Sequence, residues 1–174
     1  MHEQSKQLMK RFASTVPKDA HILDVGSRDV NGTFREFFPE NPYVGIDIEA
    51  GDGVDIVVPP YNYPFPDNHW DVIISGSTLE HVRHPWRWMK EVARILKPGG
   101  KLCVIVPNEH PYHEHPVDCW RIYPDGLRAL LEDFGLTVLS CDMRELHDGG
   151  THPVLGKMYV ENDEIRDTVG IATK

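Results

Sequence analysis

Short apolar runs alternate with amphipathic stretches along the chain. Seven of these runs are rich in Val, Ile and Leu. Near-continuous apolar content is typical of strands covered on both faces, as in a parallel sheet. The predicted strands are residues 21–25, 43–47, 54–58, 71–75, 101–106, 136–141 and 155–160.

Three stretches place their apolar residues at helical spacing instead. In residues 85–96 an apolar stripe repeats every three to four positions, Pro85 suits the first turn, and Pro98-Gly99-Gly100 ends the helix. Residues 124–134 and 3–13 repeat the pattern. The links between the second, third and fourth strands are too short for full helices. We therefore expect an α/β fold with a mostly parallel seven-stranded sheet and helices on both faces, trimmed in the middle.

The length and composition fit a single domain. The 174 residues are 40% apolar, which is enough for one ordinary core. We expect the domain to span residues 1–161 and a charged tail to follow at 162–174. No stretch approaches the ~18 apolar residues of a membrane helix, and residues 1–10 are polar where a signal peptide is apolar. The sequence predicts a cytoplasmic monomer or homodimer without membrane contact.

The charge and the cysteines narrow the choice of partners. The formal net charge of −9 opposes broad contact with nucleic acid, because a surface that binds phosphates is normally basic. Cys103, Cys119 and Cys141 are far apart and lack the close pairing of zinc or redox motifs. We expect buried thiols and a small-molecule partner, with no nucleic acid.

Two polar motifs stand at predicted strand ends. The segment Asp24-Val25-Gly26-Ser27-Arg28 follows the first strand and precedes Asn31-Gly32, where a helix is expected to start. A glycine turn before a helix exposes backbone N–H donors to a ligand, although it can also be a simple turn. Asp47 ends the second strand about 20 residues later, where an acid can bind ribose hydroxyls or cap a turn. Together they favour a nucleoside-containing cofactor.

Two further segments carry a resemblance to a known family. Residues 63–82 read YPFPDNHWDVIISGSTLEHV, and residues 91–100 read EVARILKPGG. With the strand-end motifs, they resemble class I S-adenosylmethionine-dependent methyltransferases of the ubiquinone-biosynthesis type over residues 20–107. The resemblance implies a single Rossmann-like methyltransferase domain, S-adenosylmethionine as cofactor, and methyl transfer to a small-molecule acceptor. We expect an oxygen atom to receive the methyl group.

The resemblance also implies which residues bind the cofactor. Asp24, Gly26 and Ser27 would surround its methionine part. Asp47 would bind the ribose, with Ile48 beside the adenine. The glycine loop holds fewer glycines than is usual in the family.

Other implied contacts lie further along the chain. Ser75, Gly76 and Ser77 would line the floor near the sulfonium, mainly through backbone groups. Pro59 stands where the family often has an acid near the adenine amino group. Adenine recognition is therefore expected from backbone groups or from Tyr61 and Asn62.

His81 is a candidate general base. It follows the fourth strand in Leu79-Glu80-His81, where the family places residues close to the cofactor. A hydroxyl acceptor must lose its proton, and histidine is the usual base near neutral pH. The alternative is a histidine that braces the loop, and Glu80 is expected to be structural.

A denser histidine cluster occupies residues 110–121, after the fifth strand. Loops beyond the carboxyl ends of parallel strands form the ligand crevice of open α/β sheets. We expect catalytic roles for His113 and His115, and acceptor binding by Asp118 and Arg121. The alternative is a polar lid that is braced by Trp120 and by an ion pair between Arg121 and Asp118.

The same cluster also suggests a metal site. His110, His113 and His115 could join Asp118 or Cys119 around an ion. No regular helix aligns these side chains, and two prolines interrupt the run. The sequence therefore favours the lid, and we expect no metal.

Three rival functions fit less well or stay open. A nicotinamide-dependent oxidoreductase needs a fuller Gly-x-Gly-x-x-Gly loop than the one at Gly26. Residues 58–61, Val-Pro-Pro-Tyr, resemble a signature of DNA amino-methylating enzymes, but Val58 lacks the required acceptor and the segment follows the third strand. A non-catalytic partner or regulatory module that binds S-adenosylmethionine remains an alternative, because a short chain has little room for an acceptor site.

Overall fold

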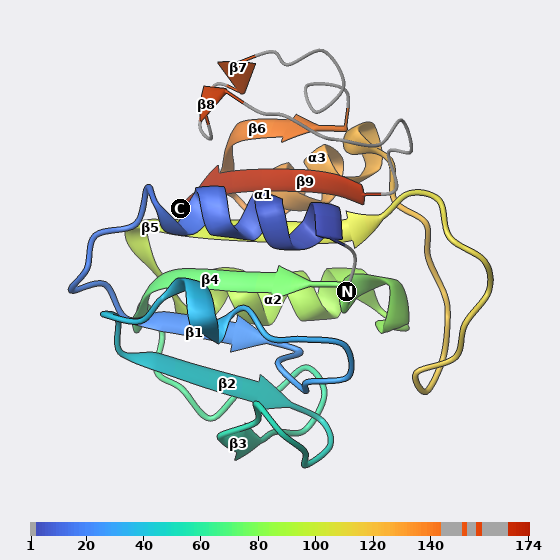
Figure 1. Ribbon diagram of the computed structural model, residues 1–174, viewed down its shortest axis with the longest axis horizontal. Helices are drawn as coiled ribbons and strands as arrows, with labels where there is room; N and C mark the ends of the chain where they lie inside the picture. Colours follow the sequence, from blue (N-terminus) through green and yellow to red (C-terminus); the bar gives the residue numbers. More distant parts are fainter. Residues whose placement is uncertain (1–2, 144–150, 153–155, 158–166) are drawn as a thin grey trace.

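One mixed sheet forms the centre of the molecule (Figure 1). The computed structural model describes residues 3–143, 151–152, 156–157 and 167–174. Seven strands lie in the order β3-β2-β1-β4-β5-β9-β6. Their bounds are β1 (Ile22–Val25), β2 (Tyr43–Asp47), β3 (Ile56–Val57), β4 (Trp70–Gly76), β5 (Leu96–Pro107), β6 (Thr137–Asp142) and β9 (Asp167–Thr173). A separate antiparallel pair consists of β7 (Thr151–His152) and β8 (Gly156–Lys157).

The order of the parallel strands reverses at β1. β2 pairs with one side of β1 and β4 with the other. β3 is added beside β2 and β5 beside β4, and all five strands run parallel. The carboxyl ends of these strands therefore meet at one edge. In an open α/β sheet, the crevice at such a switch point is where ligands bind. The predicted mostly parallel seven-stranded sheet is confirmed.

Helices cover both faces, as the sequence predicts. In Figure 1, α1 (Glu3–Ala13) lies in front of the sheet, and α2 (Pro85–Ile95) and α3 (Pro124–Asp133) lie behind it. Each face has its own core because each helix buries one apolar stripe. The buried stripe residues are Leu8, Met9 and Phe12 in α1, and Trp88, Met89, Val92, Leu127 and Leu131 in α2 and α3. Among the described helices, none has the length and apolar character of a membrane span.

The link after β1 differs from the expectation. The helix predicted to start beyond Asn31-Gly32 is replaced by an irregular loop and the three-residue 3-10 helix η1 (Arg35–Phe37). Asp29 Oδ1 accepts a hydrogen bond from the Gly32 N–H at 2.6 Å, which stabilises a turn where a helix would need its own backbone bonds. Phe34 and Phe38 then bury against α1 and anchor the loop. The links between the second and fourth strands are expected to lack full helices, and the link between β1 and β2 lacks one as well.

The predicted charged tail is wrong for its last residues. Asp167–Thr173 forms β9, which inserts between β5 and β6 and runs antiparallel to both. Its first six residues are all buried, and Gly170 lets the Leu127 side chain approach within 2.8 Å of where a Cβ would stand. The seventh strand expected at residues 155–160 falls mostly outside the described residues, and its described part, Gly156–Lys157, pairs only with β7.

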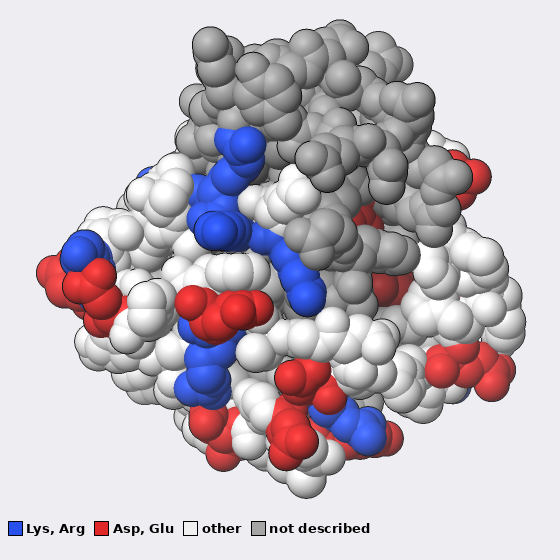
Figure 2. Space-filling model, in the orientation of Figure 1, with Lys and Arg blue, Asp and Glu red and all other residues white. Residues whose placement is uncertain are grey.

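Charges of both signs share the surface. On the face drawn in Figure 2, basic side chains gather near α1, and acidic ones lie between and around them. Surface ion pairs include Lys18 with Glu40, Arg28 with Glu49, and Arg35 with Asp55. Such exposed pairs contribute about 0–1 kcal/mol each, so the fold depends on its two cores instead.

Candidate active site

A cavity of about 670 Å³ opens at the carboxyl edge of the parallel strands. Small-molecule sites span roughly 300–1,000 Å³, so the cavity has the size of a cofactor site. The predicted site residues that line it are Asp24, Gly26, Ser27, Asp47, Ile48, Tyr61, Gly76, Ser77, His81, His113 and His115. Those that lie outside its lining are Asn62, Ser75, Asp118 and Arg121.

The end of β1 supplies a buried carboxyl and a tight turn. The Tyr43 hydroxyl donates a hydrogen bond of 2.6 Å to Asp24 Oδ2, and burial raises the pKa of Asp24 to about 7. Gly26 has φ +85°, and a Cβ there would lie 2.1 Å from Thr78 Oγ1. Only glycine therefore lets the loop pass this close to the segment after β4.

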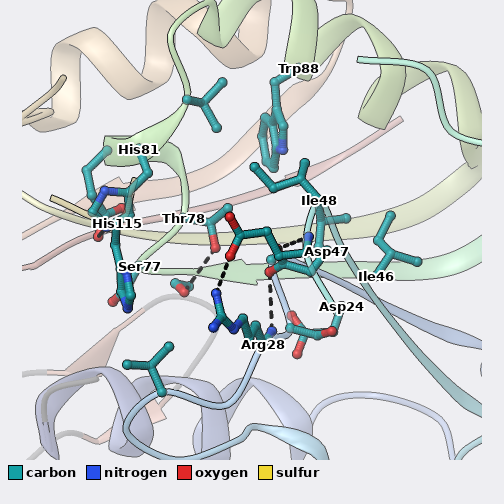
Figure 3. Close-up of a pocket in the computed structure, with 18 of the residues that line it drawn as sticks. Asp24, Arg28, Ile46, Asp47, Ile48, Ser77, Thr78, His81, Trp88 and His115 are labelled. Atoms are coloured by element: carbon teal, nitrogen blue, oxygen red, sulfur yellow. Dashed lines mark hydrogen bonds and ion pairs between the residues drawn. The ribbon is translucent and has the colours of Figure 1, made fainter. Parts of the chain in front are cut away.

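The end of β2 presents a second carboxylate to the cavity. Asp47 accepts backbone hydrogen bonds from the N–H of Arg28 at 3.3 Å and of Glu49 at 3.1 Å. An ion pair between Arg28 and Glu49 closes over this position, as the dashed lines in Figure 3 show. The loop after β1 and the end of β2 are thus tied together around Asp47, which keeps its carboxylate at the cavity wall.

The end of β4 forms the floor predicted for Gly76 and Ser77. A Cβ at Gly76 would lie 2.4 Å from the Phe34 ring, and Ser77 has φ +54° while its N–H donates to Ile105 O. Ser75 instead turns away from the cavity, because its hydroxyl donates a 2.7 Å bond to Val25 O and ties β4 to β1. The backbone of β4 therefore forms this floor, and the Ser75 side chain does not.

The adenine end of the predicted site has a different lining from the one expected. Tyr61 lines the cavity with φ +62°, and the Arg87 guanidinium lies 4.8 Å from its ring centroid. Asn62 lies outside the lining, whereas Val58 and Pro60 contribute to it. This end is therefore apolar and aromatic.

Four histidines, His81, His110, His113 and His115, form one side of the cavity and are called here the histidine wall. The His81 ring lies 5.0 Å from that of His113 and 6.5 Å from that of His115, and the His110 ring lies 4.5 Å from that of His113. Figure 3 shows His81 and His115 on the same side of the pocket, across from Asp47. The fold thus brings together two segments that are about 30 residues apart in sequence.

His81 is fixed in one tautomer. Its Nδ1 lies 2.5 Å from Val117 O, and because a carbonyl oxygen can only accept, Nδ1 carries the hydrogen. The lone pair is then on Nε2. Burial lowers the pKa of His81, so the ring is neutral at pH 7.

Glu80 is a buried carboxyl in the wall of the cavity. Its side chain is 1% exposed, and burial raises its pKa to about 8. Glu80 Oε1 lies 3.7 Å from His81 Nε2, and within the described residues Oε2 has no hydrogen-bond partner. The expected structural role applies to its backbone, since Glu80 O accepts from the N–H groups of Cys119 and Trp120.

Asp118 and Arg121 form a brace behind the loop. Arg121 binds both carboxylate oxygens of Asp118, at 2.6 and 2.7 Å, which lowers the pKa of Asp118 and raises that of Arg121. The guanidinium also donates to His110 O and Pro111 O. Neither side chain lines the cavity, so the structure favours the bracing alternative over the predicted contact with an acceptor.

Several cavity residues were not predicted. Trp88 has the spacing of the apolar stripe of α2, yet it lines the cavity, and its buried Nε1–H has no partner within the described residues. Figure 3 shows its ring above Ile48 and Asp47. Thr78 and Phe34 enter because they pack on Gly26 and Gly76. No local pattern marks these positions.

The fold and the cavity define a class: a doubly wound α/β domain with a nucleotide-type site at its switch point. The family model of the methyltransferase domain matches residues 1–141. The chain therefore belongs to this family, the class I S-adenosylmethionine-dependent methyltransferases, whose cofactor is S-adenosylmethionine.

Individual relatives align over shorter stretches. The ubiquinone/menaquinone biosynthesis C-methyltransferase UbiE of Laribacter hongkongensis is 45% identical over 42 residues, 24% of this chain and 17% of the relative. The 2-methyl-6-phytyl-1,4-hydroquinone methyltransferase of Spinacia oleracea is 28% identical over 62% of this chain and 29% of the relative. The chain thus spans less than half the length of these curated relatives.

A solved structure matches the whole fold. An S-adenosylmethionine-dependent methyltransferase of Archaeoglobus fulgidus superposes with a TM-score of 0.72 over 99% of this chain and 94% of that one. The sequence identity is 16%, so this likeness supports the fold alone.

Proposed function

We propose that this chain transfers the methyl group of S-adenosylmethionine to a hydroxyl oxygen of a small-molecule acceptor. The main support is that one cavity joins the ends of β1 and β2 to the histidine wall. Methyl transfer is an in-line displacement, so cofactor and acceptor must be held side by side at attack distance. A single shared cavity meets that requirement.

The described residues at the strand ends fit the cofactor. Gly26 leaves a cradle that a Cβ would fill. Trp88 lines the same cavity, and within the described residues its buried Nε1–H has no hydrogen-bond partner. Asp47 is suited to hydroxyls of a ribose, and the buried Asp24 to an ammonium group. When bound, the cofactor supplies an activated methyl group on a positively charged sulfur.

The histidine wall fits a hydroxyl acceptor. As the oxygen–methyl bond forms, the hydroxyl proton must leave, and the bond electrons of the departing methyl remain on the sulfur. His81 is neutral and carries its lone pair on Nε2, which makes that atom a proton acceptor at pH 7. His113 and His115, which line the same side, complete the proposed acceptor contact.

The first test is cofactor binding. S-adenosylhomocysteine at 100 times its dissociation constant should stabilise the fold by about 2.7 kcal/mol, while NAD should give no shift. The measurement is thermal unfolding with each ligand. A shift with NAD alone would contradict the proposal, because it would assign the cavity to a nicotinamide cofactor.

The second test identifies the acceptor atom. The names of the relatives make substituted hydroquinones a reasonable first panel. With a ¹³C-methyl donor, we expect a product whose new carbon resonates as a methoxy group in NMR spectra. A ring-methyl signal would contradict the proposed oxygen acceptor and show that a ring carbon receives the methyl group. Cofactor binding without turnover on a broad panel of hydroxyl compounds would favour the non-catalytic module.

A further inference from the structure

The Glu80 carboxyl is buried in the cavity wall, and one of its oxygens has no hydrogen-bond partner within the described residues. Glu80 is 1% exposed, and within the described residues its Oε2 has no hydrogen-bond partner. Leaving a carboxyl oxygen buried without a partner is costly, so such a group usually has a ligand or a role in chemistry. Glu80 is one of the residues that line the cavity.

Two histidines place ring nitrogens beside this carboxyl. One ligand atom each from Glu80, His81 and His113 lies within 4.8 Å of the other two. The distance from Glu80 Oε1 to His81 Nε2 is 3.7 Å. Two ligands of a tetrahedral Zn²⁺ at ~2.1 Å are about 3.4 Å apart. The first pair is thus close to ligand spacing, and a small shift of His113, which lies on a loop, would bring in the third.

The hydrogen bonds around both rings support the same arrangement. A histidine that binds a metal usually donates its other N–H to a backbone carbonyl or a carboxylate. His81 Nδ1 is bound to Val117 O at 2.5 Å. His113 Nδ1 lies 3.1 Å from Pro111 O and 3.4 Å from Asp118 Oδ2. In both residues these contacts occupy Nδ1 and leave Nε2 for an ion.

We propose that Glu80, His81 and His113 bind a divalent transition-metal ion of the Zn²⁺ type in the acceptor half of the cavity. Two imidazoles and one carboxylate are a ligand set that such ions favour, and the cavity leaves the remaining positions open. Mg²⁺ and Ca²⁺ should bind more weakly because they prefer oxygen ligands. This set differs from the three histidines of the loop that the sequence suggested.

Asp118 and Arg121 are positioning residues for this site. Asp118 Oδ2 accepts from the His113 backbone N–H at 2.7 Å, and Arg121 holds the carboxylate through both oxygens. The brace therefore fixes the loop that carries the third ligand. Its removal should weaken metal binding without removing a ligand.

The role of the ion rests on the proposed function. An ion bound to the acceptor hydroxyl would lower the pKa of that hydroxyl and orient its oxygen. With the ion bound, His81 Nε2 would be a ligand and no longer the proton acceptor proposed for the metal-free site. His115, which lines the cavity outside the three ligands, would then take up the acceptor proton.

Metal binding itself is the test. Tag-free protein is stripped with a chelator and titrated with Zn²⁺ against a chromogenic indicator, and with Co²⁺ followed by visible absorption. We expect one equivalent to bind. Glu80→Gln and His113→Ala should each weaken binding at least ~10-fold, and Asp118→Asn about 10–100-fold. His84→Ala is the matched control, because His84 is exposed and outside the cluster.

Two outcomes would overturn the proposed metal site. Wild-type protein that binds no Zn²⁺ would do so, and so would unchanged affinity in Glu80→Gln together with loss in His115→Ala, which would point to the loop histidines. If Glu80→Gln fails to fold, the Zn²⁺ affinity of the loop variant His113→Ala tests the proposal, and an unchanged affinity would overturn it. Thermal shifts with S-adenosylhomocysteine on the same samples separate the two ideas: cofactor binding without Zn²⁺ binding removes only the metal site, and the reverse removes only the proposed function.

Discussion

At the residue scale, the fold changes the pKa of Asp24, which lies in the proposed cofactor site. It ends β1, is 3% exposed, and accepts a hydrogen bond from the Tyr43 hydroxyl. Burial raises its pKa to about 7, although the hydrogen bond and Arg35 oppose this shift. The carboxyl is therefore poised between its two protonation states at neutral pH, next to the proposed place of a cationic ammonium group.

This raised pKa predicts that cofactor affinity depends on pH. A positive group beside Asp24 favours the ionised form, so binding below pH 7 must expel a proton. Affinity for S-adenosylhomocysteine should fall up to tenfold per pH unit below about 7 and level off above it. Calorimetry at pH 6 and 8 measures this. Asp24→Asn should flatten the profile, and a flat wild-type profile would contradict the assignment.

The same pKa fixes the sign of a stability effect. Because the folded pKa of Asp24 is raised from 3.8 to about 7, the folded state holds an extra proton between these values. The contribution of Asp24 to the free energy of unfolding therefore falls as pH rises through this window and is lost above it. The unliganded Asp24→Asn variant lacks this decline.

At the element scale, β9 decides how the sheet is completed. It pairs with β5 over residues 101–107 and with β6 on its other side, so it is an interior strand. Its residues Val169, Ile171 and Ala172 are at most 1% exposed. A segment with these properties is part of the core, which is why the description of residues 162–174 as a charged tail fails for Asp167–Thr173.

Shortening one side chain tests whether β9 is an interior strand of the sheet. Ile171→Ala should lower the free energy of unfolding by about 2–5 kcal/mol, because Ile171 is fully buried in the core on the α1 side. Leu139→Ala is the matched control. Leu139 lies on β6 and is 41% exposed, so its truncation should cost about 0.5 kcal/mol or less. Denaturant unfolding measures both, and equal small losses would mean that β9 does not form.

At the scale of the whole molecule, the topology creates the site. The reversal of strand order at β1 leaves a crevice between the loops of β1 and β4, and the cavity occupies it. Because no α-helix follows β1, the loop from Ser27 to Phe34 itself forms the wall of the cavity on this side. The proposed cofactor residues thus come from the ends of β1 and β2, and the proposed acceptor residues from the loops after β4 and β5.

How much of the site could be predicted follows from how local its signals are. Asp24, Gly26 and Asp47 stand at strand ends with a recognisable spacing, so the sequence placed them correctly at the cavity. Trp88 has the spacing of a core residue and gave no signal, because one helical stripe can serve both a core and a cavity. The direction in which Asp118 points could not be predicted, since a loop has no side-chain period.

The sequence alone determined the helices α1, α2 and α3, most of the parallel strands and the family, because apolar periodicity and strand-end motifs lie in neighbouring residues. Only the tertiary structure decided that β9 enters the sheet, that the link after β1 has no α-helix, and that Glu80 and His81 meet His113. These outcomes depend on contacts between segments far apart in the chain. Such contacts are selected by the burial and pairing of the whole fold, which no local pattern contains.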